Sequence, residues 1–460
     1  MLKIALVNPP LYTRYPQPPL GLALIGAELE KAGYTVTLLD ANAAQLTPEE
    51  IPSLVAGVDV IGLTAMTPTI STALKIALLI KKARADIKII MGGAHATMLP
   101  AETMASGPEI DVIVRGEGDE TIVELMKALE ANKTLESVAG IAYRGEGRVK
   151  FTAERPCLAD MDALPFPAYH LLPWKSYQPH PPHGLRRPFA AVVTSRGCPY
   201  HCAYCSKPVF GTKFRAQSPE RVIAELEYLQ KTLGVKEIAF YDDSFTLDKK
   251  RIHAIADKIV TSKIKIAWTC ETRVNLVDKE LLKHMKESGC YSVSYGIETA
   301  SPEIIKVLHK DTSIPQVEEA VRATREAGIG VVGYFMLGSP GETPETIRQT
   351  IDFAKRLKVD FAQFSVTTPF PGTELYDIYM RNRQEPISWD SFVYAGTDNP
   401  TTPVFESDNL TREDLKKWLA YAYRAFYLRP GYLWQRLRRC TSWDEIRMNF
   451  KGFGMLLKSV

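Results

Sequence analysis

The stretch Thr194-Ser-Arg-Gly-Cys198-Pro-Tyr-His-Cys202-Ala-Tyr-Cys205 decides the interpretation of this chain. Its three cysteines have the spacing Cys-x3-Cys-x2-Cys and follow directly on an apolar run. Three thiolates on one short loop can bind three irons of a [4Fe–4S] cluster, which leaves the fourth iron without a protein ligand. Such an open iron can be chelated by an amine and a carboxylate, and S-adenosylmethionine (SAM) is bound in this way before its reductive cleavage.

Two other uses of these cysteines are weaker. A zinc site usually takes four ligands, often as two separated Cys-x2-Cys pairs. His201 lies inside the loop, but its ring would crowd the ligands on either side. Seven cysteines in 460 residues do not form the disulfide framework of a secreted protein. The remaining cysteines are scattered and unpaired: Cys157, Cys270, Cys290 and Cys440. Cys270 lies near a strand end, and we interpret it as a small buried residue rather than a radical quencher.

Length and composition are those of an ordinary globular protein. A chain of 460 residues is expected to form two or three domains with large cores. A formal net charge of +3 is too small to suggest a nucleic-acid partner. No run of 18 apolar residues occurs, and the first residues do not resemble a signal peptide. We therefore expect a cytoplasmic protein, which also suits an oxygen-labile cluster.

Residues 1–150 predict an α/β domain with a doubly wound, Rossmann-like parallel sheet, because short apolar runs alternate with helical patterns. In such a sheet, ligands bind at the carboxyl ends of the strands. Predicted strands are 4–7, 36–39, 58–63, 87–91 and 112–114, and predicted helices are 20–32, 70–83 and 121–131.

A proline-rich linker is expected over residues 151–188, followed by a second α/β domain over 189–395. Six strands alternating with longer helices predict an open six-stranded βα barrel, a partial TIM barrel, with its chemistry at the carboxyl ends of the strands. Predicted strands are 189–195, 237–241, 265–270, 291–296, 331–336 and 361–366; predicted helices are 218–233, 249–262, 278–288, 315–327 and 344–357.

Polar residues follow successive strands of this barrel. Asp242 and Asp243 could accept hydrogen bonds from a ligand ammonium group, and Arg273 could pair with a carboxylate in bidentate fashion. Glu298 could accept from hydroxyl or amine groups, and the turn Gly338-Ser-Pro-Gly-Glu342 ends the fifth strand. Each acidic residue alone could be a solvated helix cap, but five such signals at successive strand ends indicate a binding site.

With its cysteine loop and an aromatic residue just before the last cysteine, the chain resembles the radical SAM enzymes. The resemblance implies that Cys198, Cys202 and Cys205 bind a [4Fe–4S] cluster. It also implies a SAM-binding set comprising Tyr204, Asp242, Asp243, Arg273, Glu298 and Gly338. No residue is assigned a direct catalytic role.

The first domain resembles the cobalamin-binding domain that precedes many radical SAM domains, since small residues and glycines stand at its strand ends. The implied cobalamin-binding residues are Asn8, Pro9, Thr64, Ala65, Met66, Thr67, Gly92, Gly93, His95, Gly116, Glu117 and Gly118. The sequence departs from mutase-type domains, because no Asp-x-His-x-x-Gly follows the first strand. His95 is the one histidine of this domain, and we interpret it as a residue lining the nucleotide-tail site rather than a cobalt ligand.

Residues 396–460 predict a helical C-terminal segment, with Thr411 as the cap of its first helix. Arginines beside large apolar residues form a basic amphipathic face. Two interpretations stay open: a lid packed on the barrel, or a surface for a peripheral membrane contact at the inner membrane face or for a lipid or tetrapyrrole.

Taken with the resemblance, the sequence predicts a cobalamin-dependent radical SAM enzyme of the methyltransferase type. It would act on a small-molecule or lipid substrate and need a one-electron reductant such as a flavodoxin or ferredoxin. One alternative is an oxidative cyclase or ring-rearranging enzyme that uses the same cofactors on a lipid or tetrapyrrole. Another is a cobalamin- or redox-sensing binding protein without turnover. No interior residue of the predicted barrel indicates the charge of the substrate.

Overall fold

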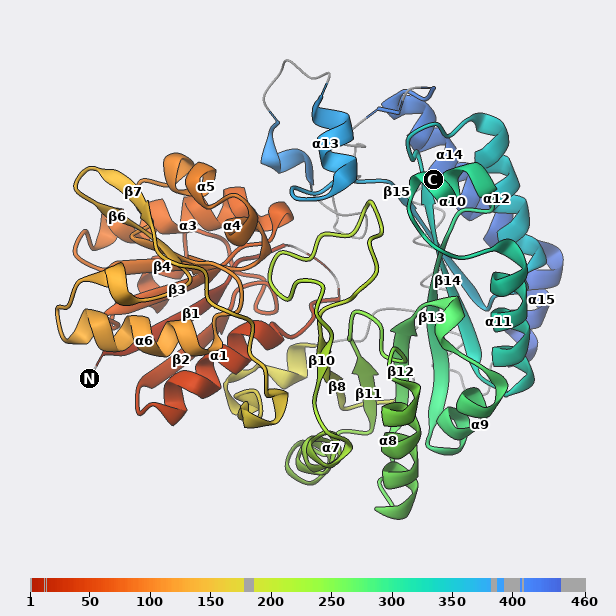
Figure 1. The fold of residues 1–460 in the computed structure, drawn as a ribbon, viewed down its shortest axis with the longest axis horizontal. Helices are drawn as coiled ribbons and strands as arrows, with labels where there is room; N and C mark the ends of the chain where they lie inside the picture. The colour runs from red at the N-terminus through yellow and green to blue at the C-terminus, as the bar shows by residue number, and fades with distance from the viewer. Residues whose placement is uncertain are drawn as a thin grey trace.

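A computed structural model describes residues 2–11, 13, 15–177, 186–381, 387–392, 406–407 and 409–439, with side chains described only to residue 434. The chain forms two separate large sheets, one mainly and one entirely parallel, and helices pack on each (Figure 1). This confirms the predicted fold class: a Rossmann-like sheet is followed by an open six-stranded βα sheet.

The N-terminal sheet has the strand order β2-β1-β3-β4-β5-β6-β7. Its first five strands are parallel, as predicted. The last two form an antiparallel hairpin that extends the sheet, and this hairpin was not predicted. The strands are β1 (Lys3–Asn8), β2 (Thr35–Asp40), β3 (Val60–Thr64), β4 (Lys88–Gly92), β5 (Val112–Val114), β6 (Ile141–Gly145) and β7 (Arg148–Phe151).

Helices cover both faces of this sheet, and two buried clusters, one on each face, fill the space between. Apolar side chains on these helices are buried at the spacing of one helical face, as Ile76, Ala77 and Ile80 are. The helices are α1 (Leu20–Lys31), α2 (Ile51–Leu54), α3 (Ile70–Ala83), α4 (Ala94–Met98), α5 (Pro100–Ser106) and α6 (Asp119–Glu130).

Short 3₁₀ turns occupy part of the proline-rich segment, and six parallel strands follow it in the order β8-β11-β12-β13-β14-β15. Every predicted barrel strand is present, with bounds that differ by a few residues. The strands are β8 (Phe189–Val192), β11 (Glu237–Phe240), β12 (Ala267–Thr272), β13 (Cys290–Glu298), β14 (Gly330–Leu337) and β15 (Phe361–Val366). A separate antiparallel pair is formed by β9 (Ser195–Arg196) and β10 (Arg215–Ala216).

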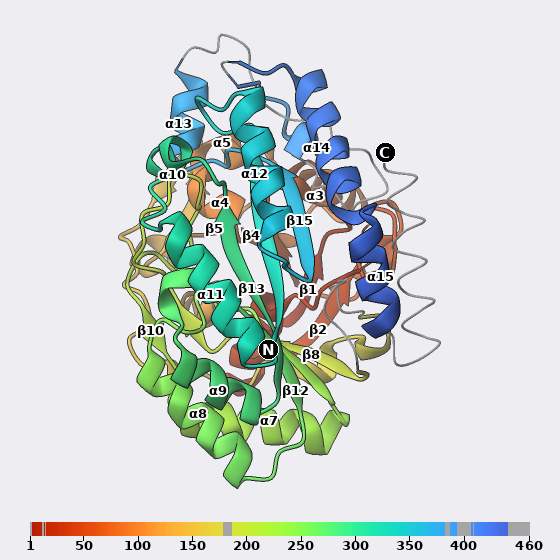
Figure 2. The same cartoon turned by 90° about the vertical axis from the view of Figure 1, so that its right-hand side faces the viewer.

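The helices between these strands pack on the outer face of the sheet (Figure 2). Side-chain caps fix several of their starts: Ser218, Asp248 and Thr343 each accept a hydrogen bond from a first-turn backbone N–H. These helices are α7 (Pro219–Leu233), α8 (Lys249–Thr261), α9 (Lys279–Glu287), α10 (Pro302–Val307), α11 (Ile314–Glu326) and α12 (Pro344–Arg356). A further helix, α13 (Glu374–Met380), follows β15, and its Leu375 N–H donates to the carbonyl oxygen of Ala203.

Two C-terminal helices follow, α14 (Arg412–Tyr427) and α15 (Pro430–Arg439). Thr411 caps α14 as predicted, through a capping box with Asp414. The hydroxyls of Tyr423 and Tyr427 donate to backbone carbonyls of β15, so α14 packs on the barrel. In the described part of the chain, no helix has the length and apolar character of a membrane span. The predictions for 393–405, 408 and 440–460 lie outside the described residues.

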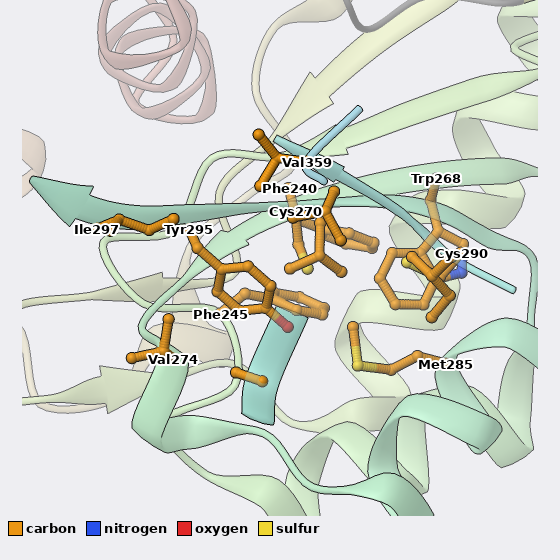
Figure 3. Packing of buried hydrophobic residues seen from close by; sticks show 14 of the residues in the cluster. Phe240, Phe245, Trp268, Cys270, Val274, Met285, Cys290, Tyr295, Ile297 and Val359 are labelled. Carbon is orange, nitrogen blue, oxygen red and sulfur yellow. The ribbon is translucent and has the colours of Figure 1, made fainter. Parts of the chain in front are cut away.

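The core of the second domain lies between its sheet and the outer helices (Figure 3). Phe240 stacks on Phe245 with a centroid separation of 4.4 Å, and Trp268 lies edge-on to both rings. Cys270 is buried in this cluster beside Cys290, as Figure 3 shows. The interpretation of Cys270 as a small buried residue is therefore confirmed.

Candidate active site

The three cysteines lie on the loop between β9 and β10, and residues 195–216 are called the cysteine hairpin below. Cys198 is buried, Cys202 is half-buried and Cys205 is exposed. Lys207 folds the loop on itself, because its Nζ donates to the carbonyl oxygens of Cys198 (3.1 Å) and Tyr200. The Lys207 side chain thus holds the loop through its backbone carbonyls.

Within the described residues, no three His, Cys, Asp or Glu side chains converge on one point, as the ligands of a single metal ion do. The thiolates of a cuboidal cluster bind three different irons instead. Three soft sulfur donors on one loop suit an iron–sulfur cluster better than any oxygen-preferring metal.

Two carboxylates after β11 hold the base of the cysteine hairpin. Asp242 is buried, and it accepts hydrogen bonds from the backbone N–H of Thr194 (3.1 Å) and from the hydroxyls of Thr194 (2.8 Å) and Ser195. Asp243 accepts from the backbone N–H of Gly197 at 3.1 Å. Gly197 has φ +83°, and a Cβ there would lie 2.3 Å from the carbonyl oxygen of Lys213. Both predicted SAM-binding aspartates therefore bond the loop in this structure.

A buried polar triad lies beside Cys202. The carboxylate of Glu298 accepts from the Tyr204 hydroxyl and from Nζ of Lys310, each at 2.8 Å, and Nζ also donates to the Tyr204 oxygen at 2.8 Å. Glu298 has φ +68° at a register shift between β13 and β14. A bulge of this kind re-aims a side chain, and strained backbone is concentrated at functional sites. Burial, with the nearby Glu298 carboxylate second, raises the pKa of Tyr204 well above its usual value.

Arg273 connects this triad to the cysteine hairpin. Its Nη1 lies 3.2 Å from the sulfur of Cys202, and its Nη2 donates to the carbonyl oxygen of Lys310. The guanidinium stacks over the Tyr200 ring at 3.7 Å. Three of the predicted SAM-binding residues, Tyr204, Arg273 and Glu298, therefore lie together beside Cys202.

The turn after β14 is held by a carboxylate of its own. The carboxylate of Glu342 accepts from the backbone N–H groups of Gly338 (2.5 Å) and Ser339 (2.9 Å). Burial raises the pKa of Glu342 to about 7, and these hydrogen bonds oppose the rise. A Cβ on Gly338 would lie 2.6 Å from Leu415 of α14, so the C-terminal helix packs on this turn.

A buried ion-pair network joins the cysteine hairpin to the N-terminal domain. Arg196 makes a bidentate pair with Asp119 at 2.7 and 3.0 Å. Arg215 pairs with Glu117 at 2.7 Å, and Glu117 also accepts from the backbone N–H of Leu158 at 2.7 Å. All four charged side chains are at most 7% exposed. The predicted cobalamin residue Glu117 thus contacts the hairpin that carries the cysteines.

At the carboxyl end of β1, the Asp40 side chain links Asn8 to Tyr177. This carboxylate accepts from the Asn8 amide at 2.8 Å and from the Tyr177 hydroxyl at 2.7 Å. Pro9 is buried next to Asn8. Both predicted residues lie at the carboxyl end of β1, where a ligand of this sheet is expected.

The next two strand ends form a close-fitting pair of turns. Gly93 has φ +97°, and a Cβ there would lie 2.7 Å from the carbonyl oxygen of Ala65. Thr64 and Gly92 are half-buried, and Met66 is 46% exposed. The backbones of the predicted residues from Thr64 to Thr67 and of Gly92 and Gly93 therefore lie side by side.

His95 is fully enclosed. Its Nδ1 lies 3.2 Å from the Thr67 hydroxyl, and its ring meets Trp389 edge-on at 4.8 Å. Burial lowers the pKa of His95 to about 4, so the ring is neutral at pH 7. Trp389 comes from the segment after α13, which thus packs on the N-terminal domain.

The fifth strand end is open on one side. A Cβ on Gly116 would have no neighbour within 4 Å, whereas one on Gly118 would lie 3.0 Å from Ile25 of α1. The predicted residues Gly116 and Gly118 therefore flank Glu117 with space on the Gly116 side.

Two family models match the chain. The "Radical SAM superfamily" model covers residues 192–354, and the "B12 binding domain" model covers residues 12–126. The uncharacterized methyltransferase PH0819 of Pyrococcus horikoshii is 38% identical over 443 residues, which is 94% of each chain. The anaerobic magnesium-protoporphyrin IX monomethyl ester cyclase of Cereibacter sphaeroides is 31% identical over 91% of this chain and 69% of its own.

The chain belongs to the cobalamin-dependent radical SAM methyltransferase family. This family also contains cyclase relatives. Among solved structures, the radical SAM methyltransferase TsrM from Kitasatospora setae, with tryptophan substrate and a SAM analogue bound, shares the fold. It has a TM-score of 0.70 at 21% identity, covering 84% of this chain and 78% of that one.

In this radical SAM protein, sequence reasoning missed Lys310 and the two hairpin arginines. Lys310 belongs to no motif and meets Glu298 only because β13 is bulged. Arg196 stands two residues before Cys198, but its partner Asp119 is 77 residues away in the chain. A buried pair of this kind requires the domain arrangement to be known.

Proposed function

We propose that this protein methylates an unactivated carbon of a small-molecule substrate. A single observation carries the proposal: Tyr204, Arg273, Glu298 and Lys310 gather against Cys202 in a domain whose cysteine hairpin is ion-paired to the B12-binding domain. When bound, the [4Fe–4S] cluster supplies the electron that cleaves SAM to methionine and a 5′-deoxyadenosyl radical, and methylcobalamin supplies the methyl group that the substrate receives after hydrogen abstraction.

Cys198, Cys202 and Cys205 would hold the cluster. Thiolate is the ligand that iron–sulfur clusters prefer, and each cysteine is free to bind. Arg273 beside Cys202 places a positive charge next to this donor set, and it favours bound anionic groups.

SAM would lie between the cysteine hairpin and the strand ends. In our assignment, Arg273 binds the methionine carboxylate, and Glu298 accepts from ribose hydroxyls or the amine. Tyr204 packs near the adenine. Asp242 and Asp243 remain predicted neighbours of the methionine amine, in addition to holding the loop. We place Gly338 on the adenine side of SAM.

Cobalamin would lie over the strand ends of the N-terminal sheet. The backbone turns at Thr64–Thr67, Gly92–Gly93 and Gly116–Gly118 offer close backbone approach to a large, flat group. His95 is neutral, but it is enclosed by Thr67 and Trp389. Asn8, the last residue of β1, and Pro9 stand at the strand end after which a mutase-type domain carries its histidine. We therefore assign no protein imidazole to cobalt.

The partners remain predictions beyond a small-molecule substrate. A one-electron reductant such as a flavodoxin or ferredoxin would supply electrons to the cluster. The cytoplasm is the expected location of the protein. A peripheral membrane contact would use the exposed side chains of the C-terminal helices, among them Trp434, which is 59% exposed. The alternative, a helix pair that covers the barrel, is supported by the contacts of α14 with β15.

An oxidative cyclase is the second candidate, favoured by the 31% identity to the anaerobic cyclase over most of both chains. Product mass separates the two functions. Methylation adds one CH2, whereas cyclisation removes hydrogens or adds oxygen.

The test is reconstitution without oxygen. Wild-type protein is expected to form 5′-deoxyadenosine from SAM under strong reductant, and Cys202→Ala is expected to lose the cluster resonance and at least about 100-fold of this activity. Cys157→Ala is the matched control, because Cys157 is exposed and lies outside the hairpin. Equal cluster content and turnover in Cys202→Ala would refute the proposal, and so would wild-type protein that never cleaves SAM.

A further inference from the structure

The inner face of the six-stranded sheet is not fully covered. Side chains alternate between the two faces of a strand. On β14 and β15, those that face the helices, such as Phe335 and Phe364, are buried. Those on the opposite face keep part of their exposure, as Tyr334, Met336 and Gln363 do. A parallel sheet is normally buried on both faces, so this face is where a ligand fits.

Glu271 stands on this inner face, in β12. Its neighbours Trp268 and Cys270 point to the helices (Figure 3), which directs Glu271 and Arg273 to the other side. Two residues along a strand span roughly 7 Å, so Glu271 lies close to the proposed SAM site. The sequence alone had suggested no charge in the barrel interior, and this carboxylate corrects that view.

The carboxylate of Glu271 lacks a cationic partner among the residues that the structure describes. It accepts one hydrogen bond, from the Tyr334 hydroxyl at 2.8 Å. Burial raises the pKa of Glu271, and that hydrogen bond opposes the rise. A half-buried carboxylate with one hydrogen bond from the described residues keeps acceptor capacity that a ligand with N–H or O–H donors can use.

Glu237 lies on the same face and is a carboxylate with a structural role, so its hydrogen bonds and burial can be compared with those of Glu271. It accepts from the backbone N–H of Arg186 and from the Tyr291 hydroxyl, both at 2.7 Å, and it is fully buried at the start of β11. Glu271 differs because it lies near the carboxyl end of its strand and is only half-buried. Its remaining hydrogen-bonding capacity is directed at the inner face.

The inner face also meets the B12-binding domain. The hydroxyl of Tyr241, on β11's inner side, donates to the side-chain oxygen of Gln17 at 3.0 Å. Gln17 belongs to the loop after β1, the strand end where cobalamin is proposed. Tyr241, Glu271 and Tyr334 therefore line a surface between the two proposed cofactor sites.

We propose that Glu271, supported by Tyr334, recognises the substrate, and that the substrate carries a protonated amine. A cation with N–H donors supplies both the charge and the hydrogen bonds that this carboxylate lacks. The inference rests on the proposed function, because it places the substrate between the SAM and cobalamin sites. A neutral lipid would leave the carboxylate unpaired.

The experiment uses Glu271→Gln and Tyr334→Phe in the full, reconstituted chain. Glu227→Gln is the matched control, because Glu227 loses the same charge on the outer surface of α7. The first readout is 5′-deoxyadenosine formed from SAM without substrate, and all variants are expected within about threefold of wild type.

The second readout uses SAM with a deuterated methyl group and an extract of cells that encode this chain. The extract is separated at neutral pH into cation-retained and unretained fractions, and each is searched by mass spectrometry for a CD3 group in place of hydrogen.

Wild type and Glu227→Gln are expected to label a compound of the cation-retained fraction. Glu271→Gln is expected to lower this labelling by about 100-fold and Tyr334→Phe by about tenfold. Labelling only in the unretained fraction, or equal labelling by Glu271→Gln, would overturn the inference. Loss of 5′-deoxyadenosine in Glu271→Gln would instead assign the residue to SAM. If wild type forms 5′-deoxyadenosine but labels nothing, the proposed methyl transfer itself fails.

Discussion

The cysteine hairpin and the strand-end turns of the N-terminal sheet present ligand-facing residues by different means. The hairpin depends on charged side chains: Asp242 binds its base, the Arg196–Asp119 pair links it to the start of α6, and the Arg215–Glu117 pair links it to the turn before α6. The strand-end turns depend on backbone, as where Gly93 lies against Ala65 with no room for a side chain.

This difference follows from what each site has to bind. An iron–sulfur loop must hold sulfur atoms at fixed positions, and buried charged networks restrict a loop strongly when every member is paired. A large flat cofactor needs close backbone approach over a wide area, which small residues allow. Substitutions should therefore act through charge in the first region and through shape in the second.

The largest effect is expected from Arg196→Ala. It leaves the buried carboxylate of Asp119 without its bidentate partner, and breaking a buried ion pair of this kind destabilises by about 3–5 kcal/mol. We expect urea-induced unfolding of the hairpin region at lower denaturant, together with slower SAM cleavage. The measurement is the free energy of unfolding, followed by hydrogen exchange at the hairpin amides.

Arg322→Ala is the comparison for that variant. Arg322 also pairs with two carboxylates, Glu319 and Glu326, but on the exposed surface of α11. Surface pairs of this type contribute little, so its stability should stay close to wild type. A similar loss in both variants would mean that the buried network does not hold the hairpin.

How far the sequence predicted these two regions depends on the range of the interactions. The alternation of apolar runs and the helix caps are local, and they predicted all six barrel strands and the start of α14 at Thr411. The β6–β7 hairpin was missed although its turn carries a local signal. Glu146 and Gly147 both have positive φ, the geometry of a two-residue hairpin turn that a residue–glycine pair favours.

The sequence motifs predicted which residues of the site lie near one another. The hydrogen bonds that each residue makes depend on which face of a strand its side chain occupies. Asp242 follows the helix-facing residues Ile238 and Phe240 in register, so its carboxylate turns to Thr194 rather than to an open ligand face. Lys310 and Arg196 could not be predicted, because a bulge and a domain interface bring them to their partners.

Gly93→Ala tests whether the strand-end turns of the N-terminal sheet depend on close backbone packing. The left-handed φ of +97° and a Cβ 2.7 Å from the Ala65 oxygen should together destabilise the domain by about 3 kcal/mol. Cobalamin affinity, measured by spectroscopic titration, should fall at least about tenfold because the two turns must separate.

Gly57→Ala serves as its control, since a Cβ at Gly57 has no neighbour within 4 Å and Gly57 precedes the amino end of β3, at the opposite edge of the sheet from the carboxyl ends. Unchanged cobalamin binding in Gly93→Ala would show that the Ala65–Gly93 contact is not part of the cofactor site.

The smallest expected effect is a pH dependence of stability, to which one buried residue of each domain contributes with opposite sign. Burial lowers the pKa of His95 from 6.5 to about 4, so the unfolded chain binds this proton first, and the N-terminal domain loses about 2 kcal/mol as pH falls from 7 to 5. Burial raises the pKa of Glu342 from 4.5 to about 7, so the folded barrel holds this proton longer. The stability that Glu342 contributes through its raised pKa is therefore present at pH 5, and about 2 kcal/mol of this stability is lost as pH rises to 7.

The two contributions have opposite signs, so single variants should reveal each one as a change from the wild-type profile. His95→Gln removes the histidine contribution, so its stability at pH 5 relative to pH 7 should exceed the wild-type difference by about 2 kcal/mol. Glu342→Gln should do the reverse. Urea unfolding at both pH values measures these differences, and a pH dependence identical to that of wild type in either variant would show that the altered residue does not titrate as its burial requires.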